Sequence, residues 1–135
     1  MVPQRNGDDD TAQSVLLVAE DDLMQRHALA TMLRLASFHV YEAANAEEAL
    51  RLWHSPLKFD ALITDVEMPG EMDGLQLVDI IRSSDQQILL VVVSGLDLAR
   101  QMRVRSQAFF RKPIETDQLI DFLQRNLGRK KDNGG

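Results

Sequence analysis

The chain has 135 residues, of which 44% are hydrophobic, and a formal net charge of -6, which suits one globular domain with a single core. It contains no cysteine, which excludes disulfides and thiolate-bound zinc, and its negative charge argues against a nucleic-acid partner. No apolar stretch reaches the roughly 20 residues of a membrane-spanning helix, and the first residues lack the parts of a signal peptide, so we expect a cytoplasmic protein without membrane contact.

Apolar runs of strand length alternate along the chain with stretches of helical spacing. Residues 1–13 are polar and are expected to form a disordered tail. Strands are predicted at residues 14–19, 39–43, 61–64, 88–93 and 108–110, each followed by a helix, of which the one after the fourth strand is short and polar. Residues 128–135 are expected to form a second disordered tail, which leaves one folded domain over residues 14–127.

The predicted helix starts carry capping residues. Asp22 is followed three residues later by Gln25, and Asn45 by Glu48, in the manner of a capping box. Asp73 is expected to cap the third helix. The first two caps come just after predicted strands, which supports the division into strand and helix pairs.

Alternating strands and helices, with strands that are apolar along their whole length, predict an α/β three-layer sandwich. Its core would be a five-stranded parallel sheet in the flavodoxin-like order 2-1-3-4-5, with helices on both faces. In such sheets the functional side chains gather beyond the carboxyl ends of the strands. The strand ends are therefore where a functional site is expected.

Four of the five predicted strands are followed by polar residues, which are Glu20, Asp21, Asp22, Asp65, Ser94 and Lys112. Carboxylates held close together oppose one another's ionisation unless a cation lies among them, and magnesium is held by carboxylates and water. We therefore predict a Mg²⁺ site. Such a site suits phosphoryl transfer, with Asp65 as the nucleophile. Ser94 would hydrogen-bond to one phosphoryl oxygen and Lys112 would pair with another.

Several segments together resemble the receiver domain of two-component response regulators. They are VAEDD at 18–22, ITDVEMPG at 63–70 with MDGLQL at 72–77, VVVSG at 91–95 and FFRKP at 109–113. The resemblance extends over almost the whole predicted domain. It implies the flavodoxin-like fold and a phosphorylation site at the carboxyl edge of the sheet.

The resemblance implies a role for each site residue. Asp65 corresponds to the phosphorylated aspartate, Ser94 to the switch hydroxyl and Lys112 to the phosphate-pairing lysine. Magnesium would be held by the carboxylates of Glu20, Asp21 and Asp65 and by the backbone carbonyl of Glu67. Asp22 is left out of this set because family members usually place an arginine where Arg26 lies relative to the acidic pair.

Three features differ from typical members of the family. Glu71 is an extra residue between Met-Pro-Gly and Met-Asp-Gly, and the segment from Ser94 to Lys112 is shorter than usual. Phe109 replaces the commoner tyrosine at a position that turns inward or outward with phosphorylation, so any switching there would rest on packing. Pro113 keeps the family pattern, in which a cis proline directs the lysine inward.

The resemblance implies a phosphoacceptor switch of a two-component or phosphorelay system. It would accept a phosphoryl group onto Asp65 from the phosphohistidine of a histidine kinase or a histidine phosphotransfer protein, in a magnesium-dependent reaction. We expect a stand-alone, chemotaxis-regulator-like receiver, a monomer or weak homodimer, that is not an enzyme and signals to an unidentified output protein by direct contact.

Other functions stay open at this point. The chain could be an excised receiver of a hybrid histidine kinase or larger regulator, or a pseudo-receiver that binds partners without phosphorylation. An aspartyl-phosphate phosphatase is less favoured. Such enzymes carry a D-x-D pattern after the first strand, whereas here Glu67 takes the second acidic place and the motif lies on the third strand.

Overall fold

The computed structural model describes residues 14–97 and 108–128. These residues form one five-stranded parallel sheet in the order β2-β1-β3-β4-β5, which confirms the predicted fold class. Each strand lies within one residue of its predicted position; the strands are β1 (Val15–Ala19), β2 (His39–Ala43), β3 (Ala61–Asp65), β4 (Leu89–Ser94) and β5 (Ala108–Arg111).

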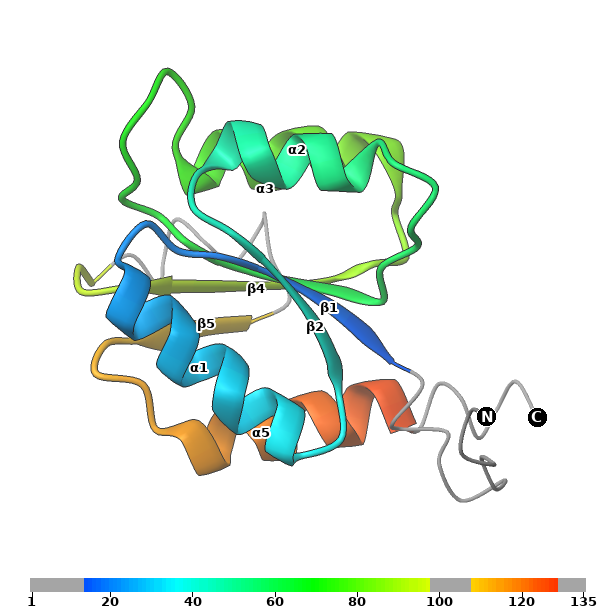
Figure 1. The fold of residues 1–135 in the computed structure, drawn as a ribbon, viewed down its shortest axis with the longest axis vertical. Coiled ribbons are helices and arrows are strands. Elements are labelled where there is room, and N and C mark those ends of the chain that lie inside the picture. Colours follow the sequence, from blue (N-terminus) through cyan, green and yellow to red (C-terminus); the bar gives the residue numbers. More distant parts are fainter. Residues whose placement is uncertain (1–13, 98–107, 129–135) are drawn as a thin grey trace.

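Helices cover both faces of the sheet. They are α1 (Leu23–Leu35), α2 (Ala46–Trp53), α3 (Gly74–Ser84) and α5 (Thr116–Leu123), and α5 continues into a short π-helix, η3 (Gln124–Gly128). Figure 1 shows α2 and α3 on one face and α1 and α5 on the other. The helix predicted after the fourth strand falls largely on residues 98–107, which lie outside the described residues. No described helix is long and apolar enough to span a membrane.

The three central strands, β1, β3 and β4, are almost wholly apolar because they are buried on both faces. Alternate residues of β1 belong to opposite cores: Leu17 lies in the core under α2 and α3, and Leu16 in the core under α1 and α5. All residues of β3 and β4 are buried. A helix on only one face would leave half of these side chains in water, so the sequence pattern requires both outer layers.

The strand registers bring the carboxyl ends to one edge of the sheet. Ala19 of β1 pairs with Thr64 of β3, and Asp65 pairs with Val93 of β4. Ser94 pairs in turn with Arg111 of β5. The residues that follow these positions therefore meet at the same edge, as the sequence predicted.

The three predicted caps are present. The side chain of each cap accepts a hydrogen bond from the backbone N–H three residues later: Asp22 from Gln25 at 2.9 Å, Asn45 from Glu48 at 2.7 Å, and Asp73 from Gln76 at 2.9 Å. Each contact satisfies a backbone donor that the first helical turn leaves without an intrahelical partner.

A complete capping box also needs a reciprocal hydrogen bond, from the backbone N–H of the cap to the side chain three residues later. Among the described helices it closes at Asp73, whose N–H donates to Gln76 Oε1 at 2.9 Å. At the start of α2, Glu48 accepts instead from the N–H of Ala44. At the start of α1, the N–H of Asp22 donates to Glu20. The pattern at Asp22 and Asn45 therefore marks the two helix starts correctly but gives a cap without the reciprocal bond, because neighbouring groups compete for the same donors and acceptors.

The start of α3 packs directly on the end of β3. A Cβ atom added to Gly74 would lie 1.9 Å from the carbonyl oxygen of Asp65. The N–H of Gly74 donates to the carbonyl of Val66 at 2.9 Å, which fixes this approach. Only a glycine lets the helix begin so close to the strand that carries Asp65.

Gly74→Ala should therefore destabilise the fold by about 3 kcal/mol, because backbone atoms must move to admit the methyl group. Gly95→Ala is the matched control, since a Cβ there meets nothing within 4 Å, and it should change stability by less than about 0.5 kcal/mol. Urea unfolding of the two variants measures the difference. Equal stability of the two variants would contradict the packing described here.

Candidate functional site

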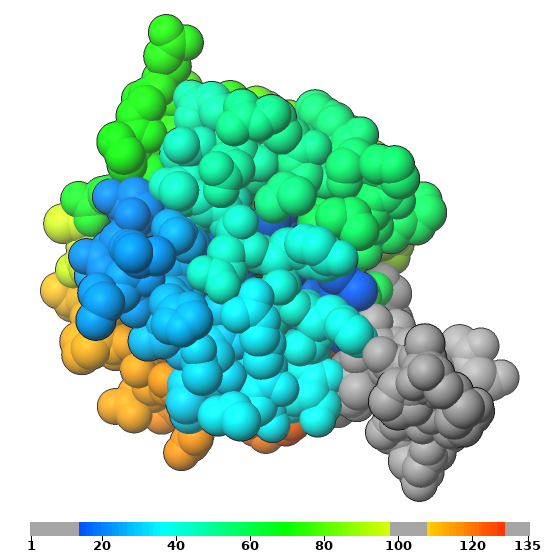
Figure 2. Space-filling view, viewed as in Figure 1, coloured from blue at the N-terminus to red at the C-terminus, as the bar shows by residue number. Residues whose placement is uncertain are grey.

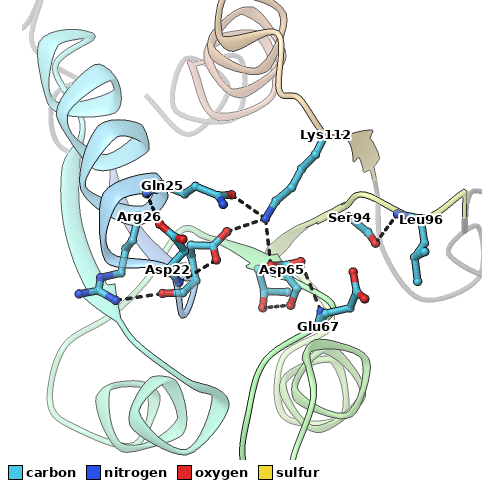
Figure 3. A network of polar contacts seen from close by, with 10 residues as sticks. Asp22, Gln25, Arg26, Asp65, Glu67, Ser94, Leu96 and Lys112 are labelled. Carbon is cyan, nitrogen blue, oxygen red and sulfur yellow. Dashed lines mark hydrogen bonds and ion pairs between the residues drawn. The ribbon is translucent and has the colours of Figure 1, made fainter.

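Side chains from three strand ends converge at the carboxyl edge of the sheet (Figure 3). Glu20, Asp65 and Ser94 are buried, with 6%, 7% and 0% of their surface exposed. Asp21 is exposed beside them. Polar groups are rarely this buried without a partner, so the contacts around them decide what the site can do.

Three carboxylates form a compact cluster. One oxygen atom each of Glu20, Asp21 and Asp65 can be chosen so that all lie within 4.8 Å of one another. Hard oxygen donors of this kind suit Mg²⁺ rather than zinc. The donor set therefore fits the magnesium ion predicted from the sequence.

Lys112 supplies the positive charge of the site. Its Nζ donates hydrogen bonds to Glu20 Oε1 at 2.8 Å, to Gln25 Oε1 at 2.9 Å and to Asp65 Oδ2 at 3.0 Å. The backbone N–H of Lys112 donates to the carbonyl of Ser94 at 2.9 Å, and the peptide bond to Pro113 is cis. The lysine predicted from the sequence thus lies against the predicted acceptor.

The second oxygen of each buried carboxylate is held by the backbone. Glu20 Oε2 accepts from the N–H of Asp22 at 3.0 Å, and Asp65 Oδ1 accepts from the N–H of Glu67 at 3.3 Å. Both carboxylates are therefore fixed from two sides. Glu67 lies beside the acceptor through its backbone, and its side chain is exposed.

Burial and pairing oppose each other at Glu20 and Lys112, and the pKa of both groups is raised. Burial raises the pKa of Glu20 above its ordinary value of 4.5, although hydrogen bonds from Lys112 and from the N–H of Asp22 oppose it. Burial lowers the pKa of Lys112, but its hydrogen bonds and ion pairs with Glu20 and Asp65 outweigh burial and raise it. Lys112 therefore stays an ammonium group, whereas Glu20 gains a proton more readily than an exposed glutamate.

Ser94 and Phe109 lie where the sequence predicted. The hydroxyl oxygen of Ser94 accepts from the N–H of Leu96 at 3.0 Å, at the end of the strand next to Asp65. Phe109 is half-buried and packs against the core under α2 and α3. The aromatic ring is therefore held by apolar contacts, in agreement with the loss of the tyrosine hydroxyl.

Arg26 stabilises the backbone beside the carboxylate cluster. Its Nη1 donates to the carbonyl of Glu20 at 3.0 Å, and its Nε pairs with Glu42 at 3.2 Å. Glu42 also pairs with Arg34 at 3.0 Å. These contacts tie the end of β1 to α1 and β2. In the sequence, Arg26 stands out only as part of a motif, and nothing in its spacing indicates Glu42 as its partner.

The extra residue Glu71 lies on a loop that projects from the body of the molecule (Figures 1 and 2). Met68 and Met72 pack against the core on either side of the loop tip. Gly70, at φ 110°, makes the turn between them. Glu71 therefore lies at the exposed tip of the loop, between two methionines that pack against the core.

The fold and the site together define a flavodoxin-like α/β protein with an acidic site at the carboxyl edge of its sheet. Residues 16–124 match the family model described as response regulator receiver domain. The chain is 35% identical over 119 residues to response regulator protein FleR of Pseudomonas aeruginosa, a match that covers 85% of this chain and 24% of FleR. The chain therefore belongs to the response regulator receiver domain family.

Solved structures are similar in fold. A receiver domain protein from Clostridium thermocellum superposes with a TM-score of 0.79 at 21% identity, covering 88% of this chain and 98% of that one. The receiver domain of a signal transduction histidine kinase from Syntrophus aciditrophicus gives 0.77 at 25% identity, covering 86% and 91%. The chain spans only about a quarter of the length of curated relatives that it matches, namely 28%, 26% and 24% of the first three.

Lys112→Gln should destabilise the fold by about 1 to 3 kcal/mol at neutral pH, because two buried carboxylates lose their cation. The raised pKa of Glu20 means that the folded chain binds this proton more tightly than the unfolded chain, so stability falls as the pH rises above about 4.5. Without Lys112 that pKa rises further. The loss should therefore shrink as the pH falls toward about 5.

Urea unfolding at several pH values measures this dependence. Lys58→Gln is the control, since Lys58 is exposed, and its effect should stay within about 0.5 kcal/mol. A loss in Lys112→Gln that is the same at pH 5 and pH 8 would contradict the pairing of Lys112 with Glu20.

Proposed function

We propose that the protein is a phosphoacceptor switch in which Asp65 receives a phosphoryl group. The proposal rests on one observation: Asp65 accepts a hydrogen bond from Lys112 at 3.0 Å and shares a cluster with the carboxylates of Glu20 and Asp21. The nucleophile, a cation to pair with phosphoryl oxygens and a set of metal ligands are thus in one place. This combination supports phosphoryl transfer by positioning and charge neutralisation.

The reaction follows from the chemistry of a carboxylate. An oxygen of Asp65 attacks the phosphorus of a phosphohistidine, a P–O bond forms, and the P–N bond breaks. The electron pair of that bond stays on the imidazole nitrogen, and Asp65 becomes an acyl phosphate. Lys112 pairs with one phosphoryl oxygen, and the hydroxyl of Ser94, which accepts from the N–H of Leu96, donates its own proton to another.

Glu20, Asp21 and Asp65, with the backbone carbonyl of Glu67, would hold the magnesium ion. When bound, magnesium neutralises charge on the transferring phosphoryl group. The chain's own contribution is orientation. The backbone N–H groups of Asp22 and Glu67 fix the carboxylates of Glu20 and Asp65, so neither has to reorganise as charge develops.

The phosphoryl donor in this proposal is a histidine kinase or a histidine phosphotransfer protein in the cytoplasm, and output passes through protein contact. The chain matches only about a quarter of the length of its curated relatives, which favours a second possibility, a receiver that works within a larger regulator. Similarity to the receiver of a histidine kinase favours a hybrid kinase as one such setting. Both settings use the same chemistry at Asp65. The complete set of site residues argues against a pseudo-receiver.

Incubation with acetyl phosphate and magnesium should add one phosphoryl group to the chain, measured as intact mass. The adduct should be lost in Asp65→Asn, which removes the nucleophile, and should fail to form when magnesium is chelated. Absence of an adduct in the unchanged protein would favour a pseudo-receiver, and continuous release of phosphate from phosphoesters would favour a phosphatase.

Magnesium should raise the melting temperature, because a ligand of the folded state stabilises it by about 2.7 kcal/mol at 100 times the dissociation constant. Asp21→Ala should abolish this shift, with little effect on stability since Asp21 is exposed. Asp22→Ala is the matched control. It should lose about 1 kcal/mol with the cap of α1 and keep the full magnesium shift. A shift that vanishes in Asp22→Ala and persists in Asp21→Ala would overturn the ligand assignment.

A further inference from the structure

Two helices of this chain begin with the same capping sequence and use its glutamine differently. At the start of α3, Gln76 Oε1 accepts from the N–H of Asp73 at 2.9 Å and closes the box. At the start of α1, Asp22 caps the backbone of Gln25, but Gln25 Oε1 accepts from Lys112 Nζ at 2.9 Å instead. Lys112 lies 87 positions further along the chain. Helix capping therefore does not explain where this side chain points.

The local geometry accounts for the difference. The N–H of Asp22, which a complete box would give to Gln25, donates to Glu20 Oε2 at 3.0 Å. Gln25 is left without its capping donor while its backbone stays fixed by Asp22 Oδ1. Figure 3 shows the Gln25 side chain extended from α1 toward the Lys112 ammonium.

Gln25 differs chemically from the other two acceptors of Lys112. The ammonium has three N–H donors, and they meet Glu20, Gln25 and Asp65. Glu20 and Asp65 carry negative charge and belong to the carboxylate cluster. Gln25 is neutral and outside it. A cation bound by the cluster draws charge from the two carboxylates and repels the ammonium, but leaves the amide oxygen of Gln25 as it was.

Few other side chains in the groove beside Lys112 could accept a hydrogen bond from its ammonium in place of Gln25. Gln25 and Lys112 lie at one side of a groove between α1 and residues 113–116, and the remaining lining is largely apolar: Ala28, Leu29, Met32, Pro113, Ile114 and Thr116. Thr116 is the one other side chain in this lining with a hydrogen-bonding group. Within this groove, the amide oxygen of Gln25 is therefore the group that holds the Lys112 ammonium by a hydrogen bond.

We propose that Gln25 is a positioning residue that keeps the Lys112 ammonium beside Asp65 when the carboxylate cluster is occupied by a divalent cation. This role of Gln25 rests on the proposed function, because the cation-bound protein is the form that accepts the phosphoryl group. Gln25 itself touches neither the phosphoryl group nor the metal. It acts through Lys112.

The test is a double-mutant cycle on the rate of Asp65 phosphorylation by acetyl phosphate at saturating magnesium. Gln25→Met, which keeps the length of the side chain and removes the acceptor, should slow the reaction about threefold to tenfold, the loss expected for one hydrogen bond. In a Lys112→Ala background the same change should have no further effect. Gln118→Met, at an exposed glutamine of α5, should react like the unchanged protein.

Two outcomes overturn the positioning role: an unchanged rate in Gln25→Met, or an equal loss with and without Lys112. If the unchanged protein takes up no phosphoryl group at all, the proposed function fails, and urea unfolding then tests the contact alone. If the double variant lowers the urea midpoint by less than the sum of the two single variants, Gln25→Met and Lys112→Ala, the hydrogen bond between Gln25 and Lys112 is supported. Additive losses would refute it.

Discussion

The central constraint on this molecule is that Glu20 and Asp65 are nearly buried, belong to one carboxylate cluster, and need a cation. Lys112 meets that need, with its ammonium 2.8 Å from one carboxylate and 3.0 Å from the other. Burial raises the pKa of Glu20, and the hydrogen bond from Lys112 opposes this effect. With the lysine present, Asp65 is held as an oriented carboxylate at the edge of the sheet. The registers of β1, β3, β4 and β5 matter to function because they bring these groups together.

The same lysine links elements that are otherwise separate. Its ammonium contacts the ends of β1 and β3 and the first turn of α1, and its backbone N–H reaches Ser94 at the end of β4. A change in charge at Asp65 therefore acts on several elements at once through one side chain. That arrangement suits the proposed switch, in which a local chemical event alters contacts elsewhere. Gln25 gives the lysine a neutral partner during the change.

The sequence predicted the fold, and the acidic residues and lysine that it singled out lie together at the sheet edge. Both predictions were possible because strand and helix periodicity and the polar residues after strands are local signals. The sequence could not predict which way Gln25 points, since Asp-x-x-Gln occurs at both α1 and α3 and the outcome depends on Glu20, a residue outside the pattern. The requirement for glycine at position 74 could not be predicted from the sequence either. It arises from the carbonyl of Asp65, which only the packed structure brings within reach.

The proposed switch depends on Asp65 being the residue that carries the phosphoryl group. Borohydride reduces an acyl phosphate to the alcohol, so treatment of the phosphorylated protein should convert residue 65 to homoserine, which peptide mass spectrometry can locate. Conversion at position 65 alone is the predicted result. Conversion at Asp21, Asp22 or another carboxylate, with residue 65 unchanged, would contradict the assignment of Asp65 as the acceptor.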